Sequence, residues 1–234
     1  MQHLLNGLCL RPGLHGYQLR MVGKEQAASA HIQRINECKQ QNEEEFKTTV
    51  SKNGLSYGEN MLAAGTAQST YNSWRKVMEE IFIGGCSNIC GEVADQKMGQ
   101  AYRATTSGGS STHIGEDGTP EKDDPNYIES PYSFNSYTDF KGNILSIQYT
   151  LYGKARSNEE ASASIMNYLY DYAPNVGKEL KSRLVTALEA LDKCLNSGKA
   201  FVQDPAASVV KDAMYAIGDL DSYLGQTSDW ILQN

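Results

Sequence analysis

The chain has 234 residues, of which 40% are apolar and 21% are charged, with 28 acidic against 21 basic side chains and a formal net charge of -7. An apolar share of this size is enough for a sizeable core and excludes wholesale disorder, and the length suggests one or two domains. The acidic balance argues against a protein that binds nucleic acid or an anionic membrane surface, because both functions need a surplus of Lys and Arg.

The N-terminal sequence MQHLLNGLCLRPG lacks the features of an export signal. It has a short apolar run with no Lys or Arg before it, and Leu8 rather than a small residue precedes Cys9. We therefore expect no signal peptide and no lipoprotein box here. The protein is then either cytoplasmic, or this chain lacks its native start.

The first half of the chain contains two helical patterns. Residues 27–50 are typical of a polar helix. Between residues 74 and 93, apolar residues at helical spacing predict a second helix, which contains Gly84 and Gly85. Two glycines weaken an isolated helix, so we expect another backbone to approach closely there. The stripe consists of Trp74, Val77, Met78, Ile81, Gly85, Ile89 and Val93.

Five cysteines are too few for a disulfide scaffold, and their odd number leaves at least one thiol unpaired within the chain. Cys86 and Cys90 are four residues apart, so a helix places both thiols on one face. Burial as small apolar side chains is the favoured interpretation, because a structural zinc site needs four ligands and no second pair is present. The remaining three cysteines are Cys9, Cys38 and Cys194.

The middle of the chain combines a polar loop with two shorter helices. Residues 105–128 are rich in Ser, Thr, Gly, Asp and Pro, which indicates a solvated, flexible loop that extends over about 103–128. Residues 136–152 carry a helical stripe, and residues 159–170 can form one more short helix. The stripe contains Phe140, Ile144, Ile147, Leu151 and Tyr152.

The last third predicts two long helices. The first begins at Pro174-Asn175 and ends at Asn196-Ser197-Gly198, and the second begins at Asp204-Pro205, with Asp as N-cap and Pro at the first helical position. The short connection between them favours an antiparallel hairpin. The first stripe is Leu180, Leu184, Leu188, Leu191 and Leu195, and the second is Val210, Ala213, Ile217, Leu220, Leu224, Thr227 and Ile231.

The predicted fold is an all-α, up-and-down helical bundle, because no run of alternating β-branched residues indicates a sheet.

A first candidate site is the segment Gly13-Leu14-His15-Gly16-Tyr17-Gln18. On a helix, His15 and Gln18 share a face, as do the metal ligands of bundle di-metal sites. A neutral amide is a weak metal ligand and cannot act as a general base. A surface or structural role for His15 is the competing interpretation.

A second candidate is the aromatic and polar segment 129–143. Ser136 is a plausible N-cap, with Asp139 in the position of the capping-box carboxylate. Capping does not account for the remaining polar residues, which could face one cleft. No Gly-x-Ser-x-Gly elbow surrounds Ser133, so a serine hydrolase is not indicated. The remaining polar residues are Glu129, Ser133, Asn135 and Asn143.

A third candidate combines Glu59 and Asn60, in GENMLAAG, with Glu92 and Asp95, in EVADQKMG. Glu92 and Asp95 share a helix face. A solvated helix end is the alternative to a ligand-binding role for them.

These segments occur in an order that resembles the imelysin family. The resemblance runs through GENMLAAG, then EEIFIGGCSNICGEVADQKMGQAY, then ESPYSFNSYTDFKGNILSIQYTLYG, and continues weakly into ALEALDK and VKDAMYAIGDLDSYL. It covers about residues 55–232, and ESPYSFNSYTDFKGN is its most specific part.

The resemblance implies an all-helical protein of two bundle-like halves, exported to the periplasm or outer-membrane surface, with a membrane anchor such as a lipoprotein's possible in the full-length protein. Imelysins are classed as metallopeptidases through a Gly-x-His-x-x-Glu motif, and members are associated with iron uptake. Here the motif falls on Gly13, His15 and Gln18, so the carboxylate is replaced by an amide. The resemblance further implies a domain boundary after residue 54. Residues 1–54, with the Gly-x-His-x-x-Gln motif, would be the remnant of an N-terminal helical half whose upstream helices fall outside this chain, and residues 55–234 would be a C-terminal bundle.

Three functions follow from the resemblance. In the first, a cleft lined by the His15 segment and by 129–143 binds a divalent metal (Fe or Zn) or a metal-bearing ligand without hydrolysing peptides. In the second, the protein is a metallopeptidase in which Glu129 or Asp139 supplies the carboxylate that Gln18 lacks. In the third, it is a non-catalytic surface interaction protein, with which its 14 Tyr residues are compatible.

Overall fold

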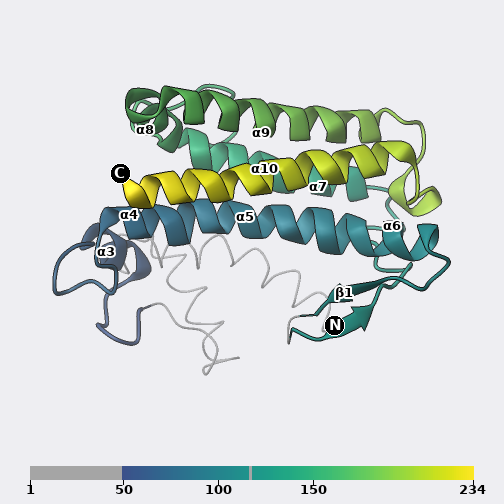
Figure 1. Ribbon diagram of the computed structural model, residues 1–234, viewed down its shortest axis with the longest axis horizontal. Coiled ribbons are helices and arrows are strands. Elements are labelled where there is room, and N and C mark those ends of the chain that lie inside the picture. The colour runs from purple at the N-terminus through teal and green to yellow at the C-terminus, as the bar shows by residue number, and fades with distance from the viewer. Residues whose placement is uncertain (1–48, 116–117) are drawn as a thin grey trace, which may run out of the picture. The chain divides into compact units, whose positions relative to one another are not determined.

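The computed structural model describes residues 49–115 and 118–234 (Figure 1). The chain forms two compact units, Met1–Val77 and Met78–Asn234. The helix predicted at 27–50 lies outside the described residues apart from its last two positions, where Thr49 forms an isolated β-bridge with Ser56. The domain boundary predicted after residue 54 stays a prediction.

The described part of unit 1 contains the short helices α3 (Tyr57–Leu62) and α4 (Trp74–Val77). Ser56 begins α3 with a capping box, in which its hydroxyl accepts from the Glu59 amide at 3.2 Å and the Glu59 carboxylate accepts from the Ser56 amide at 2.9 Å. The box satisfies two amides that the first helical turn leaves free.

Unit 2 begins with one continuous helical run from Met78 to Thr106. It consists of η2 (Met78–Ile83), α5 (Gly84–Gly91), η3 (Glu92–Met98) and α6 (Gly99–Thr106), and both η segments are π-helical. After a hairpin follow α7 (Ser136–Tyr152), α8 (Ile165–Tyr172), α9 (Pro174–Leu195), the 3-10 turn η4 (Phe201–Gln203) and α10 (Ser208–Gln233).

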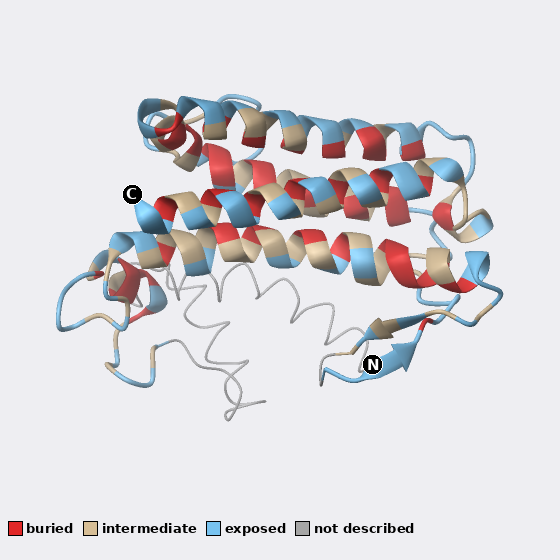
Figure 2. Ribbon diagram, viewed as in Figure 1, coloured by how far each residue is buried: buried red, intermediate tan, exposed pale blue. Residues whose placement is uncertain are grey.

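The four long helices of unit 2 form an up-and-down bundle, as predicted. The first helical run packs against α7, α7 against α9, α9 against α10, and α10 closes the ring against α5 (Figure 1). The predicted hairpin of the last two helices is therefore confirmed. Buried residues line the faces that these helices turn toward each other (Figure 2).

The apolar stripes of α7 and α10 are buried at every predicted position. Phe140 of α7 lies at the centre of an aromatic cluster, with ring centroids 5.4 Å from Phe201 and 6.4 Å from Tyr137. Edge-to-face pairs of this kind add to the stabilisation from burial. The cluster fixes the turn after α9 to the start of α7.

The predicted stripe of α9 is only partly correct. Leu180, Leu184 and Leu191 are buried, but Leu195 is 40% exposed, while Ala187, Ala190 and Cys194 are buried as well. The buried face is wider than a leucine stripe because α9 packs against three neighbours, α7, α8 and α10.

The stripe predicted for residues 74–93 is only partly correct, since Val77 and Val93 are buried as predicted. Trp74 and Ile81 are 49% and 37% exposed, whereas Ile83, Cys86 and Cys90 are buried. A π-helical turn contains more residues than an α-turn, so each π segment rotates the helix face that follows. A stripe read at 3.6 residues per turn cannot follow this change.

The expectation of a close backbone approach at Gly84 and Gly85 is also wrong. A Cβ atom at Gly84 would meet the Glu79 carbonyl oxygen at 3.0 Å, which belongs to the preceding π-helical turn, and one at Gly85 would meet nothing within 4 Å. The steric restriction therefore comes from the helical run itself.

Two helices begin later in the chain than the sequence predicted. α10 begins at Ser208 rather than at Asp204-Pro205, because the Asp204 carboxylate accepts from Lys199 Nζ at 2.9 Å and does not cap the helix. α8 begins at Ile165 rather than near 159, because the Ser164 hydroxyl caps it by accepting from the Asn167 amide at 3.1 Å.

The polar segment between α6 and α7 contains a small antiparallel hairpin that the sequence did not indicate. Its strands are β1 (Thr112–Ile114) and β2 (Pro120–Lys122), with His113 opposite Glu121. Strands of three residues are too short to produce a recognisable alternation. The hairpin does not change the predicted all-α class.

Candidate functional site

The residues predicted to form a site fall into three groups. Gly13, His15 and Gln18 lie outside the described residues. Two more lie in unit 1 and the remainder in unit 2. The unit 1 residues are Glu59 and Asn60, and those of unit 2 are Glu92, Asp95, Glu129, Ser133, Asn135, Ser136, Asp139 and Asn143.

In unit 1, Asn60 is 2% exposed and connects three polar side chains. Its side-chain oxygen accepts from the amide of Asn53 at 2.7 Å, its side-chain nitrogen donates to the Thr70 hydroxyl at 2.7 Å, and its backbone carbonyl accepts from Ser69 Oγ at 2.6 Å. These bonds hold the loop after α3, and Glu59 caps the same helix. Both side chains thus have structural partners within unit 1.

In unit 2, Glu92 and Glu129 converge on one lysine. Lys97 Nζ lies 3.1 Å from Glu92 Oε1 and 3.2 Å from Glu129 Oε2. Burial opposes the positive charge of Lys97, but the hydrogen bonds and charges of the two carboxylates raise its pKa. The lysine therefore stays protonated at neutral pH and offsets one of the two negative charges.

The segment that links Glu129 to α7 is held by two side-chain bonds. The buried Ser136 hydroxyl donates to the Glu129 carbonyl oxygen, and Ser130 Oγ donates to Asp139 Oδ2 at 2.5 Å. The predicted capping box is wrong, because α7 begins at Ser136 and its N-cap is Asn135, whose side chain makes no capping bond. The serine side chain is directed to the preceding loop instead.

The same loop projects two aromatic side chains into solvent. Tyr132 is 97% exposed and Phe134 is 57% exposed. Ser130 and Phe134 both have left-handed backbone conformations, with φ of 56° and 58°, which costs about 1 kcal/mol or more in a non-glycine residue. Ser133 is exposed and donates to the Ser130 carbonyl oxygen at 3.4 Å. Asn143 contributes its backbone carbonyl to Ser146 Oγ at 2.6 Å.

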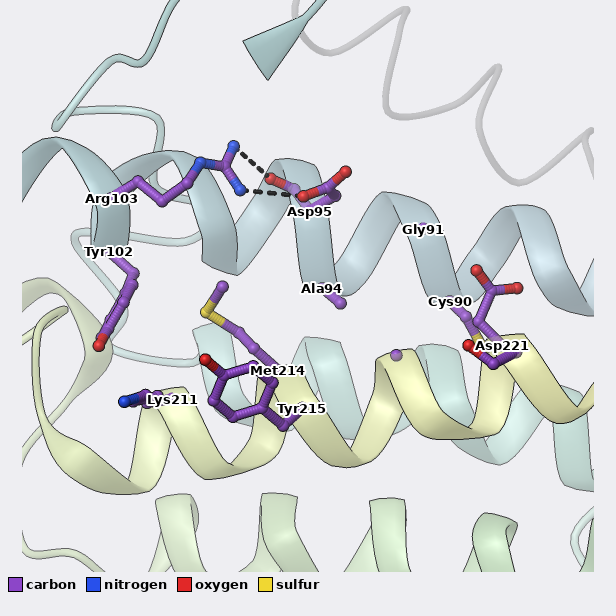
Figure 3. Close-up of a pocket in the computed structure, with 12 residues that line it drawn as sticks. Cys90, Gly91, Ala94, Asp95, Tyr102, Arg103, Lys211, Met214, Tyr215 and Asp221 are labelled. Carbon is purple, nitrogen blue, oxygen red and sulfur yellow. Dashed lines mark hydrogen bonds and ion pairs between the residues drawn. The ribbon is translucent and has the colours of Figure 1, made fainter. Parts of the chain in front are cut away.

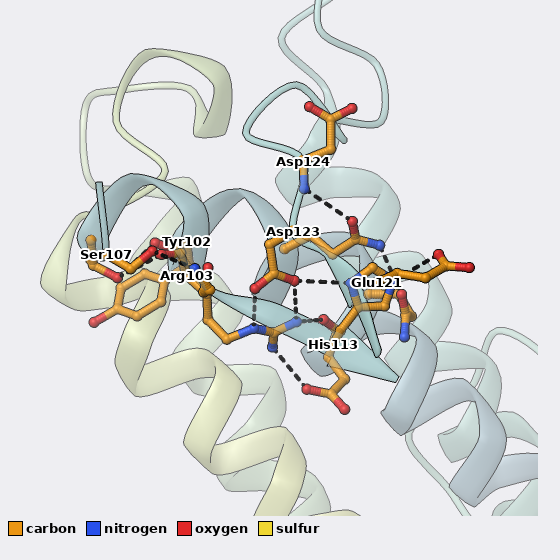
Figure 4. Close-up of polar contacts among 12 residues, drawn as sticks. Tyr102, Arg103, Ser107, His113, Glu121, Asp123 and Asp124 are labelled. Atoms are coloured by element: carbon orange, nitrogen blue, oxygen red, sulfur yellow. Dashed lines mark hydrogen bonds and ion pairs between the residues drawn. The ribbon is translucent and has the colours of Figure 1, made fainter. Parts of the chain in front are cut away.

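Asp95 belongs to a separate ionic network around Arg103, which we call the Arg103 network: Asp95, Arg103, His113, Glu121 and Asp123. Figure 4 shows how Arg103, His113, Glu121 and Asp123 lie in it. Arg103 NH1 lies 2.9 Å from Asp95 Oδ1, and its Nε and NH2 form a bidentate pair with Asp123 at 3.0 and 2.9 Å. His113 Nδ1 lies 3.1 Å from Asp123 Oδ1. The network fixes the hairpin to α6.

Asp123 is the buried centre of the Arg103 network, with a side chain that is 0% exposed. Burial alone would raise its pKa, but the hydrogen bonds and positive charge of Arg103, together with His113, lower it below the ordinary aspartate value. Asp123 is therefore ionised at neutral pH. No sequence pattern singles out Asp123, because residues 105–128 have the composition of a solvated loop.

The structure also contains a groove of about 500 Å³ between the first helical run and α10 (Figure 3). A volume of this size is ordinary for a small-molecule site. Asp95 is the one sequence-predicted site residue that lines it. The complete lining is Cys90, Gly91, Ala94, Asp95, Tyr102, Arg103, Lys211, Met214, Tyr215, Gly218, Asp221 and Ser222.

The described cysteines are buried, as predicted for small apolar side chains. Cys86, Cys90 and Cys194 are free and buried, and burial raises the pKa of Cys86 and of Cys194 to about 12. Within residues 49–115 and 118–234, no group of three or more His, Cys, Asp or Glu side chains is placed to hold a metal ion. The described residues therefore do not form a metal site by themselves.

Unit 2 defines an all-helical bundle protein with one small hairpin, and comparison with known proteins assigns its family. The chain belongs to the imelysin family, whose model matches residues 22–222. The match begins after Gln18, so it does not include Gly13, His15 or Gln18. No curated protein matches the chain.

Two solved structures share the fold. One is an imelysin peptidase from Bacteroides ovatus, with a TM-score of 0.65 and 20% identity, over 94% of this chain and 55% of that one. The other is described as an iron-regulated protein A precursor from Parabacteroides distasonis, with a TM-score of 0.61 and 21% identity, over 77% and 48%. The chain thus spans about half the length of these proteins.

Proposed function

We propose that this protein is an exported imelysin-like binding protein that holds a metal ion or a metal-bearing ligand, serves iron uptake at the periplasm or outer-membrane surface, and does not hydrolyse peptides. The link to iron is supported by the similarity to an iron-regulated protein precursor. None of the described helices is both long and apolar enough to cross a membrane.

The observation that carries the non-hydrolytic proposal is the pairing of the acidic side chains. Glu92 and Glu129 share Lys97, and Asp95 is paired with Arg103. A carboxylate held by a cation is a poorer general base and a poorer metal ligand than a free one, because each role requires its lone pairs and its negative charge. The replacement of the motif carboxylate by Gln18 points the same way.

Metal binding would rest on His15 and Gln18, since the described residues provide no metal site of their own. An imidazole and a neutral amide supply two donors without negative charge, which favours weak binding or binding of an ion that brings its own anionic ligands. A metal-bearing ligand therefore suits these residues better than a bare ion does.

Calorimetric titration tests the binding proposal. The protein would be titrated with Fe(III) citrate, Fe(II) and Zn(II), alongside His15→Ala and a control, His31→Ala, which removes another imidazole. We expect binding that is lost in His15→Ala and kept in His31→Ala. Equal binding by both variants, or no binding by the unmodified protein, would refute it.

Peptidase activity distinguishes the metallopeptidase alternative. Asp139 favours that alternative, because its described polar partner is a serine hydroxyl and not a cation. The test is cleavage of a denatured protein substrate with and without a chelator, for the unmodified chain, Asp139→Asn and Gln18→Glu. We expect no cleavage by the unmodified chain or by Asp139→Asn. Chelator-sensitive cleavage that Asp139→Asn abolishes would replace our proposal with the alternative.

A further inference from the structure

The groove between the first helical run and α10 is lined in its middle by residues with small or no side chains. Gly91 and Ala94 lie on one side and Gly218 on the other, and a Cβ atom added at Gly91 or Gly218 would meet nothing within 4 Å. The space above these glycines is therefore unfilled by the described side chains. Small residues on both helices thus leave a trough in the groove.

Aromatic and polarisable side chains surround this trough. Tyr102 extends from α6 toward α10, Met214 points into the space between the helices, and Tyr215 stands beside it on α10 (Figure 3). Tyr215 is 67% exposed although it is a large aromatic residue. Aromatic faces and thioether sulfur both interact favourably with the edge or face of another ring.

Charge is distributed unevenly along the groove. Lys211 Nζ lies 5.6 Å from the centroid of the Tyr215 ring, and no carboxylate pairs with it in the part of the chain that the structure describes. Arg103, the other cation of the lining, is already bound by two aspartates. Lys211 is thus the cation that remains available to a ligand.

The acidic side chains of the lining are placed so that they do not cancel this charge. Asp95 is paired with Arg103, and Asp221 accepts from the Ser87 hydroxyl. Asp221 is ten residues beyond Lys211 on the same helix, which separates the two by about 15 Å along the axis. An anionic group beside Lys211 would therefore meet little repulsion from Asp221.

We propose that this groove binds an aromatic carboxylate, with its ring against Tyr215, Tyr102 and Met214 and its carboxylate at Lys211. The ring would occupy the end of the trough nearest Lys211, beside Met214, and the cation would fix its orientation. This inference does not depend on the proposed metal binding and can fail or succeed separately from it.

The test compares 2-naphthoate with 2-naphthamide, which has nearly the same shape without the charge. Binding to the full chain would be measured by ligand-detected NMR titration with EDTA present, so that metal plays no part. We expect saturable 1:1 binding of naphthoate and at least fivefold weaker binding of naphthamide. Equal affinities, or no saturation at millimolar ligand, would overturn the proposal.

Variants locate the site. Lys211→Met should weaken naphthoate binding at least fivefold and leave naphthamide binding unchanged, whereas Tyr215→Ala should weaken both. Lys178→Met is the matched control, because it removes an exposed lysine from α9, whose residues do not line the groove. Circular dichroism would verify that each variant is folded. A loss in Lys178→Met equal to that in Lys211→Met would show that the effect is only one of net charge and would overturn the assignment of the site.

Discussion

Arg103 binds two aspartates that differ sharply in burial, and this difference yields a quantitative prediction. The Asp123 side chain is 0% exposed and holds Arg103 through two hydrogen bonds, whereas the Asp95 side chain is 72% exposed and holds it through one. Arg103 itself is 25% exposed. Removing the charge of Asp123 leaves a largely buried guanidinium without its main partner.

We expect Asp123→Asn to lower the free energy of unfolding by about 3 kcal/mol, the range for breaking a buried ion pair. Asp95→Asn should cost less than about 1 kcal/mol, as an exposed pair does. Urea denaturation followed by far-UV circular dichroism would measure both. In the double variant with Arg103→Met, the effect of Asp123→Asn should become much smaller, because its partner is already absent.

The dependence on pH follows from the lowered pKa of Asp123 in the folded state. A depressed folded pKa means that the carboxylate stabilises the protein above the unfolded pKa of about 3.9, and that this contribution disappears as the pH falls through the folded value. The difference between the unmodified protein and Asp123→Asn should thus be constant near pH 7 and shrink below about pH 4. Equal costs for the two asparagine variants at pH 7 would refute the reasoning.

Three further predictions concern packing. Phe140→Ala should lower the free energy of unfolding by about 3–5 kcal/mol in urea titrations, because the ring is fully buried in the aromatic cluster. In a Cys9→Ser, Cys38→Ser background, Cys86 and Cys90 should react with Ellman's reagent far more slowly in native than in urea-unfolded protein, since burial raises both pKa values. Gly225→Ala should stabilise α10 by up to about 1 kcal/mol through helix propensity and raise the melting temperature, whereas Gly177→Ala should lower it, because the new Cβ would lie 2.7 Å from the Tyr170 ring.

The sequence predicted the bundle well where its helices follow regular α-geometry. α7 and α10 bury every residue that the 3.6-residue period selected, because each packs a single continuous face. Between residues 74 and 93 the period selected some exposed positions, because it assumes regular α-turns and the π-helical turns there rotate the buried face. The predicted start of α10 was wrong because the Asp204 carboxylate pairs with Lys199 and does not cap the helix.

The candidate site was harder to predict than the fold. Local motifs selected Glu92 and Glu129, and the structure does bring these two together, but at a lysine that the motifs did not single out. Asp123 and His113 lie in a polar segment without any pattern, and their partner Arg103 comes from a helix upstream. Contacts of this kind depend on tertiary packing, which spacing along the chain does not encode.

The two π-helical segments, η2 and η3, have a consequence for comparing this chain with its relatives. A π turn holds one residue more than the α turn it replaces, so a relative in which either segment is regular α-helix would be one residue shorter there. A correct alignment would then require a single-residue gap inside a helix. Without that gap, every position from the segment to the end of α6 would be matched to a residue about 100° away around the helix axis.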